Sequence, residues 1–138
     1  MKLPHLPHDP VSEADWFEAL MNLCRYLRGP DGCPWDREQT SNDFARHSVG
    51  EMEEFLEALS GTDHSHAEEE FGDTLFVLLA AGAAAEAEGR FNVRNALERA
   101  HEKMVRRHDH VFGDTKAATP EDAIAAWERI KQQERGTK

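Results

Sequence analysis

Two pairs of acidic residues stand at a spacing that could hold a metal ion. Glu51 and Glu54 are three residues apart, and Glu70 and Asp73 repeat that spacing in the next segment. Residues three apart share one face of a helix, so two antiparallel helices could gather four carboxylates around one point. Hard oxygen ligands of this kind suit Mg²⁺ or Mn²⁺ and leave room for water and a substrate phosphate. The spacing is therefore compatible with a divalent-cation site made of these four residues.

The alternative is that these acids lie on solvated helix faces, where such pairs are common. That interpretation suits the neighbouring acids Glu53, Glu57, Glu68 and Glu69. Glu70 and Asp73 differ because they lead into an uncharged run, residues 74–85. Helical periodicity places both on an apolar face, where a carboxylate pair is costly unless positive charge meets it. That face also carries Val77, Ala80, Ala81 and Ala84.

Basic and aromatic residues further along the chain could contact a phosphorylated ligand. Lys103 and Arg107 are four residues apart and share a helix face, with Arg106 beside them. Trp127 and Lys131 repeat that spacing. The alternatives stay open: cations near a helix C-terminus complement its dipole, and Trp127 could be a core residue.

The segments that must position these residues all show helical periodicity. Helices are expected from Ser12 to the Gly29-Pro30 stop, over 40–60, from about residue 66 to residue 88, over 93–108, and from Pro120 onward. Residues 30–39 are expected to form a turn-rich connection. No segment alternates as a strand does. The sequence therefore predicts an all-α helical bundle, with residues 1–11 as an extended arm and residues 12–135 as a single helical domain.

Each of the two helices that carry the acids has an apolar stripe expected to face the core. In the first it consists of Phe44, Met52, Phe55, Leu56 and Leu59, and in the second of Phe71, Leu75, Leu78 and Leu79. The second helix is apolar on nearly every side, which favours an oligomer that covers the rest.

Composition restricts the classes of function. The chain has 138 residues and a formal net charge of −11, which argues against binding to a nucleic-acid backbone. Its two cysteines suit reduced thiols in a cytoplasm. The N-terminus lacks the apolar stretch of a signal peptide. The uncharged run is shorter than the ~20 residues that span a bilayer, so no membrane role is expected.

Six segments together resemble the MazG-type nucleoside triphosphate pyrophosphohydrolases. In order they are RGPDGCPWDREQT, GEMEEFLEAL, EEEFGDTLFVLL, EGRFNV, EKMVRRHDHVFGD and WERIK. The resemblance implies an all-α bundle of the all-alpha NTP pyrophosphatase type that forms a homodimer or homotetramer. It also implies Mg²⁺-dependent hydrolysis of nucleoside triphosphates, with Mn²⁺ able to substitute, to monophosphate and pyrophosphate, as a house-cleaning activity on the nucleotide pool.

The resemblance also implies roles for individual residues. Glu51, Glu54, Glu70 and Asp73 would hold Mg²⁺, Lys103, Arg107 and Lys131 would contact phosphates with Arg106 beside them, and Trp127 would lie near the base.

The chain departs from the family pattern at three positions. Gly50 stands where the family usually has the first glutamate of an EExxE motif, so another acid, for which Glu53 is the candidate, would have to replace its contribution. Arg37 replaces a frequent lysine, a mild change if the residue contacts phosphate. Asp109 replaces a proline and should alter a turn more than the chemistry.

Two other functions are possible from the sequence. The bundle could be a catalytically weakened nucleotide-binding or interaction module, with Gly50 as the mark of lost activity. A di-iron oxidase needs two Glu-x-x-His motifs on separate helices, and this chain shows one, beginning at Glu98.

Overall fold

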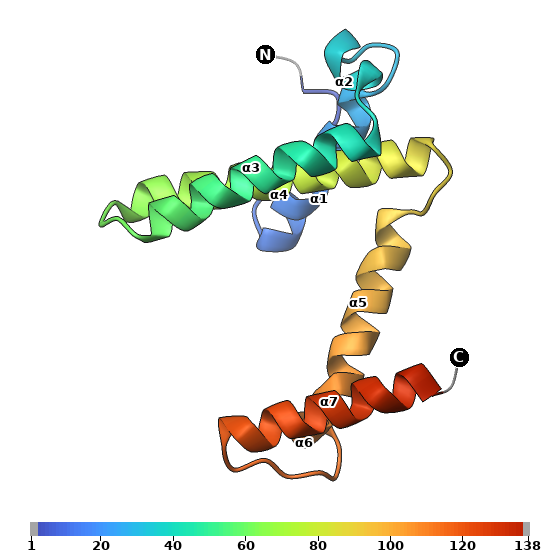
Figure 1. Ribbon diagram of the computed structural model, residues 1–138. Helices are drawn as coiled ribbons and strands as arrows, with labels where there is room; N and C mark the ends of the chain where they lie inside the picture. Colours follow the sequence, from blue (N-terminus) through green and yellow to red (C-terminus); the bar gives the residue numbers. More distant parts are fainter. Residues whose placement is uncertain (1–2, 137–138) are drawn as a thin grey trace. The chain divides into compact units, whose positions relative to one another are not determined.

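The computed structural model describes residues 3–136, and all regular secondary structure in that range is helical (Figure 1). The helices are α1 (Glu13–Leu27), α2 (Pro34–Glu38), α3 (Ser41–Leu59), α4 (His64–Ala87), α5 (Val93–Arg107), α6 (Asp109–Phe112) and α7 (Pro120–Gly136). The all-α prediction is confirmed. None of the described helices is long and apolar enough to cross a membrane.

Contacts divide the chain into two compact units, Met1–Val93 and Arg94–Lys138. The first unit is built from α1 to α4, and the second from α6, α7 and nearly all of α5. The single domain expected over residues 12–135 stays a prediction, as does the arm, of which residues 1 and 2 lie outside the described range.

Local sequence signals explain where the helices begin and end. Ser12 and Thr40 each form a capping box with the aspartate three residues later, and α4 is capped by Asp63. Gly89, at φ 74°, ends α4 because glycine adopts this conformation without steric cost. Two short helices, α2 and α6, form where only turns were expected, and α2 begins at Pro34, a residue suited to the first helical turn.

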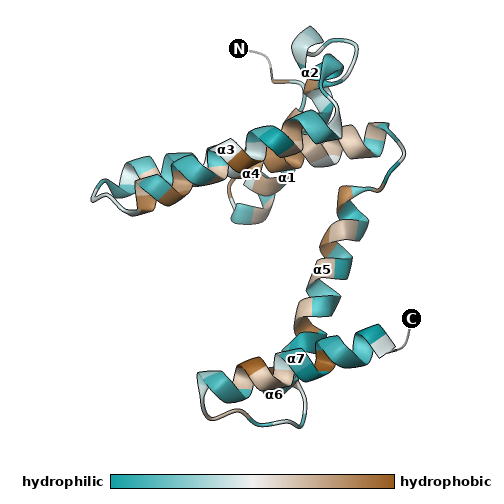
Figure 2. Cartoon of the chain, viewed as in Figure 1, coloured by the Kyte–Doolittle hydropathy of each residue, from teal (hydrophilic) through white to brown (hydrophobic). Residues whose placement is uncertain are grey.

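The core of the first unit lies around the second half of α4. Residues from Leu79 to Ala85 are all buried there, and α4 packs against α3 and α1. Figure 2 shows hydrophobic residues gathered along this half of the helix. Alanine side chains let neighbouring helices approach closely, and a Cβ on Gly82 would lie 2.6 Å from Val93 Cγ2. The face that carries Ala80, Ala81 and Ala84 is therefore the centre of this unit.

The expected core stripes are correct only in part. Phe44 and Leu79 are buried, and Leu75 and Phe55 are half-buried. The rest are exposed, which corrects the prediction: Met52, Leu56, Leu59, Phe71 and Leu78. The physical reason is that a helix pair buries one stripe of each partner, and this pair buries the alanine side. The first unit leaves the leucine and phenylalanine side uncovered.

Phe44 anchors α3 in this core and provides a test of the packing. Its ring is buried and meets the Trp35 ring of α2 edge-to-face, with centroids 5.9 Å apart. We expect Phe44→Ala to lower the free energy of unfolding by about 3–5 kcal/mol because it leaves a cavity. Urea denaturation followed by circular dichroism measures this loss. Val11→Ala is the control, since Val11 is 84% exposed, and equal losses in both variants would contradict the assignment.

Candidate active site

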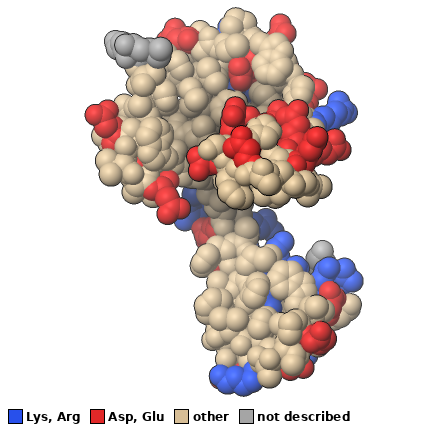
Figure 3. Space-filling view, turned by 90° about the vertical axis from the view of Figure 1, so that its left-hand side faces the viewer, with Lys and Arg blue, Asp and Glu red and all other residues tan. Residues whose placement is uncertain are grey.

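The α3–α4 pair brings three of the four predicted acids together. One carboxylate oxygen from each of Glu51, Glu70 and Asp73 lies within 4.8 Å of the other two. Glu51 comes from α3, and the other two residues come from consecutive turns of α4. Figure 3 shows acidic side chains gathered on the part of the first unit that ends in the α3–α4 turn. Three oxygens at this separation can share one cation.

Electrostatics indicates that these carboxylates repel one another. Burial raises the pKa of Glu51, and the charges of Glu54, Asp73 and Glu70 raise it further. Burial likewise raises the pKa of Glu70, followed by the charges of Glu54 and Asp73. The fourth predicted acid, Glu54, is exposed. Its charge raises the pKa of both groups, and a hydrogen bond with Glu51 also raises the pKa of Glu51. A cation among these side chains would remove the repulsion.

Glu70 supports this interpretation because one of its oxygens has no hydrogen-bond partner in the described part of the chain. The Glu70 side chain is only 12% exposed, and its Oε2 atom is buried. Its Oε1 atom lies 4.0 Å from His66 Nδ1. A buried carboxylate oxygen without a donor is unfavourable. The set of oxygen ligands and the unpartnered oxygen both fit a divalent cation such as Mg²⁺.

Thr74 fixes the register of the two helices at this point. Its buried hydroxyl lies 2.7 Å from the Glu70 carbonyl oxygen and 3.1 Å from the Glu51 carbonyl oxygen across the helix pair. The hydroxyl has one proton to donate, so it alternates between these two acceptors or shares the proton between them. The backbone positions of two acids are thereby coupled.

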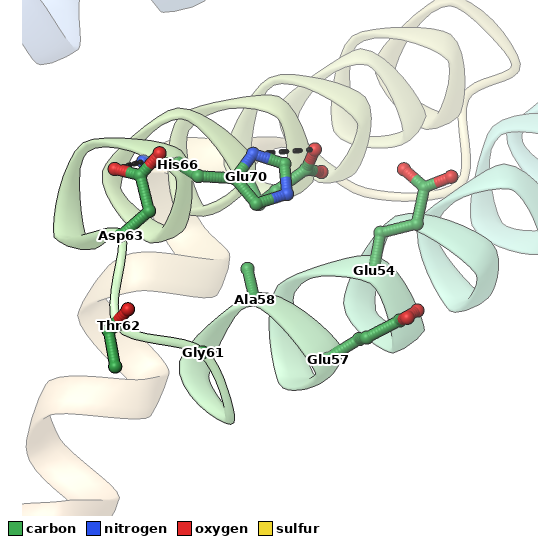
Figure 4. Close-up of a pocket in the computed structure, with 8 residues that line it drawn as sticks. All are labelled: Glu54, Glu57, Ala58, Gly61, Thr62, Asp63, His66 and Glu70. Carbon is green, nitrogen blue, oxygen red and sulfur yellow. Dashed lines mark hydrogen bonds and ion pairs between the residues drawn. The ribbon is translucent and has the colours of Figure 1, made fainter.

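A hollow of about 530 Å³ lies beside the carboxylates, towards the turn between α3 and α4 (Figure 4). Glu54 and Glu57 of α3 face Glu70 and His66 of α4 across it, and Asp63 lies at the turn. Its walls are rich in hydrogen-bond acceptors, with the His66 imidazole among them. His66 was not among the predicted site residues, because a histidine near the expected start of the helix was interpreted as a solvated side chain.

The second unit holds the predicted aromatic residue and two of the predicted arginines in one cluster. The Arg107 guanidinium carbon lies 5.2 Å from the centre of the Trp127 ring, and the His108 ring packs edge-on against that ring. Stacking of this kind is favourable for arginine. Arg106 and Arg107 both bind the carboxylate of Glu134. Trp127 is therefore packed within the unit and also touches a cation.

Four further predicted site residues remain, Lys103, Lys131, Arg37 and Glu53. Lys103 borders a surface hollow on α5 together with Arg106, and Lys131 is half-buried one turn after Trp127. Arg37 donates from Nη1 to the Gly29 carbonyl oxygen. Glu53 is exposed and is not among the acids that gather in the described part of the chain. The roles predicted for all four residues stay predictions.

Sequence reasoning missed Glu134, although a signal was present. Trp127, Lys131 and Glu134 follow one another at spacings of four and three residues, which places them on one face of α7. A carboxylate on that face is a natural partner for the arginines of α5.

Known proteins resemble this chain over most of its length. Residues 39–112 match the MazG nucleotide pyrophosphohydrolase domain. The protein YabN of Bacillus subtilis is 41% identical over 121 residues, which cover 88% of this chain and 25% of that protein. The nucleoside triphosphate pyrophosphohydrolase of Escherichia coli is 37% identical over 122 residues, covering 88% of this chain and 46% of the relative.

A solved structure is also similar to this chain. The crystal structure of a mazG-related protein from Thermotoga maritima aligns with a TM-score of 0.72 and 28% identity, over 83% of this chain and 98% of the other. In contrast, the chain spans less than half the length of the curated Bacillus subtilis and Escherichia coli relatives.

The repulsion among the acids gives a prediction for the metal-free protein. The pKa of Glu70 is raised in the folded state, so folding stability is lost as pH rises through that pKa. In buffer with EDTA at pH 8, we expect Glu70→Gln to melt at a higher temperature than the wild type. The difference should shrink at pH 5, where wild-type Glu70 takes up a proton more readily.

Added Mg²⁺ should reverse this order. A ligand present at a hundred times its Kd stabilises the folded state by about 2.7 kcal/mol. Wild type should therefore gain melting temperature with Mg²⁺ or Mn²⁺, and Glu70→Gln should gain much less. Glu68→Gln, on the exposed side of α4, should behave as wild type. A Glu70→Gln variant that keeps the full metal-induced shift would contradict the site.

Proposed function

The chain belongs to the MazG nucleotide pyrophosphohydrolase family, and we propose that it hydrolyses nucleoside triphosphates to the monophosphate and pyrophosphate. One observation carries the proposal for this chain: carboxylate oxygens of Glu51, Glu70 and Asp73 converge within 4.8 Å, on two helices locked in register. The Escherichia coli relative, which is named as a pyrophosphohydrolase, supports the same activity.

The acids of α3 and α4 would hold Mg²⁺, with Mn²⁺ able to substitute. Glu51, Glu70 and Asp73 supply the converging oxygens, and Glu54, exposed beside them, supplies the fourth carboxylate. When bound, such an ion polarises phosphoryl oxygens and neutralises their charge.

The reaction needs a water, a proton acceptor and a stabilised leaving group. Water attacks phosphorus at the α–β anhydride, the bond from phosphorus to the bridging oxygen breaks, and pyrophosphate leaves with that pair of electrons. A carboxylate takes the proton from the water. The candidates are Glu51, Glu54 and Glu53, of which Glu53 would replace the glutamate missing at Gly50. A raised pKa, such as that of Glu51, brings a carboxylate nearer to the range in which a general base works.

The substrate would be bound by the basic and aromatic residues of the second unit and by Arg37. Lys103, Arg106, Arg107 and Lys131 carry the positive charge that phosphates require. Trp127 offers a ring at which a base could stack, and its present stacking partner is Arg107.

The cellular role and the oligomeric state are proposals as well. The role would be house-cleaning of ribo- or deoxynucleoside triphosphates. The two free cysteines suit the cytoplasm. The uncovered apolar side of α3 and α4 would suit a homodimer or homotetramer. The alternative is a catalytically weakened nucleotide-binding or interaction module. Gly50 favours it, because the first glutamate of the family motif is missing.

A substrate panel with two variants tests the hydrolase. Purified protein with Mg²⁺ and canonical or modified triphosphates should release pyrophosphate and the monophosphate, separated by anion exchange. We expect Asp73→Asn and Glu54→Gln each to lower turnover by about 10²–10³-fold or more, because transition-state charge loses its support. Glu68→Gln should keep the wild-type rate. Phosphate and diphosphate as products would contradict the bond assignment, and binding without turnover would favour the alternative.

Gly50 allows a paired test of the missing glutamate. It lies exposed on α3, and a Cβ there meets nothing within 4 Å, so larger side chains fit. Gly50→Ala and Gly50→Glu should both raise the free energy of unfolding, by about 0.5–1 kcal/mol, through helix propensity. Only Gly50→Glu should raise kcat. An equal rise in both variants would assign the gain to helix stability instead of the carboxylate.

A further inference from the structure

The cluster of the second unit contains a carboxylate that no proposed step uses. Glu134 of α7 accepts hydrogen bonds from two adjacent arginines of α5. Arg106 Nε and Nη2 lie 2.9 and 2.8 Å from its Oε1, and Arg107 Nη2 lies 2.9 Å from its Oε2. Arg107 Nε lies 3.3 and 3.2 Å from Oε1 and Oε2, so its guanidinium fork meets both oxygens.

Burial explains why Arg107 needs this partner. Its side chain is 16% exposed and lies against the Trp127 ring. A guanidinium in such surroundings is costly unless a carboxylate compensates it. The arginines also lower the pKa of Glu134 to about 2, with hydrogen bonding from Arg107 as the main cause. Glu134 therefore stays ionised throughout the usual working pH range.

The arrangement leaves hydrogen-bonding capacity and charge for another anion. Two guanidinium groups and one carboxylate carry a net charge of +1. Glu134 occupies the Nε and Nη2 atoms of both arginines, and the Nη1 atom of neither makes a hydrogen bond within the described residues. Guanidinium groups held in a fixed plane bind phosphate oxygens with less loss of entropy than mobile ones.

We propose that Glu134 is a positioning residue, which holds the forks of Arg106 and Arg107 so that their free edges bind the phosphate or pyrophosphate group of the substrate. This rests on the proposed function insofar as the ligand is a triphosphate. The opposing possibility is that Glu134 competes with phosphate for the same arginines. The two roles predict opposite changes in affinity when its charge is removed.

Glu134→Gln keeps the shape of the side chain and removes its charge. We expect about tenfold weaker binding of pyrophosphate by calorimetry, because hydrogen bonds to charged groups that fix the arginines are lost. With a triphosphate substrate, KM should rise about tenfold while kcat changes less than about twofold. Glu134→Gln also makes the cluster more positive, which by itself attracts pyrophosphate. Salt at 0.5 M screens that general attraction, so the weakening should persist there.

Two further variants separate positioning from other causes. Glu128→Gln makes the same charge change on α7 at an exposed residue with no ion pair among the described residues, and should bind pyrophosphate as wild type does. Arg107→Lys keeps the charge and loses the fork. Glu134→Gln should weaken binding less in the Arg107→Lys background than in the wild type, because Glu134 acts partly through Arg107 and partly through Arg106.

The outcomes decide the proposal independently of turnover. Pyrophosphate binding that weakens in Glu134→Gln supports positioning, even if no triphosphate is hydrolysed and the proposed function fails. Equal or tighter binding in Glu134→Gln, full additivity with Arg107→Lys, or no pyrophosphate binding by the wild type would each overturn it. An equal loss of binding in Glu128→Gln would assign the effect to charge and overturn the proposal. Loss of the folded state in Glu134→Gln, judged by circular dichroism, would assign the effect to stability and also overturn the proposal.

Discussion

The close approach of α3 and α4 is the constraint on which the rest of the first unit depends. Small residues line the second half of α4, and they let the helices pack along their length. The same register then extends past the alanines to the acids at the other half, where Thr74 bridges the carbonyl oxygens of Glu51 and Glu70. The hydrophobic contribution of the alanine half must offset the repulsion at the acidic half, because like charges at such distances disfavour folding. The acids are thus held together by packing elsewhere.

That division of roles explains which parts of the site the sequence could predict. Spacing of three residues placed Glu70 and Asp73 on one face, and the structure sets them opposite Glu51 as expected. Periodicity could not decide which of the two apolar sides of α4 is covered, since both repeat at helical spacing. The assignment of Phe71 and Leu78 to the core was therefore wrong. Helices of four or five residues, such as α2 and α6, are shorter than two helical turns and leave no periodic signal.

Glu134 shows a different limit of sequence reasoning. The spacing of the basic residues on α5 predicted a cluster of positive charge that could contact phosphate. On α7, periodicity could have placed Glu134 on the same face as Trp127 and Lys131. The sequence does not show that the arginine face of α5 contacts the Glu134 face of α7. That contact depends on the path of the chain through α6 and the loop after it. A carboxylate three residues beyond a lysine is ordinarily a solvated surface charge. Its importance is visible only when both guanidinium groups are seen to share it.

The two units carry opposite charges at their candidate sites, and this restricts how an anionic substrate could bind. The acids around Glu51 and Glu70 repel one another and would repel a triphosphate still more strongly. The arginine cluster has a net positive charge even with Glu134 in place. Phosphate affinity in the absence of a cation should therefore come from the second unit, and the first unit should favour the triphosphate only when its own repulsion has been neutralised. Under the proposed function, metal binding and substrate binding at the carboxylates would for this reason be coupled by charge. Under the proposed function, a protein with a net charge of −11 would in this way act on a triphosphate without a broad basic surface.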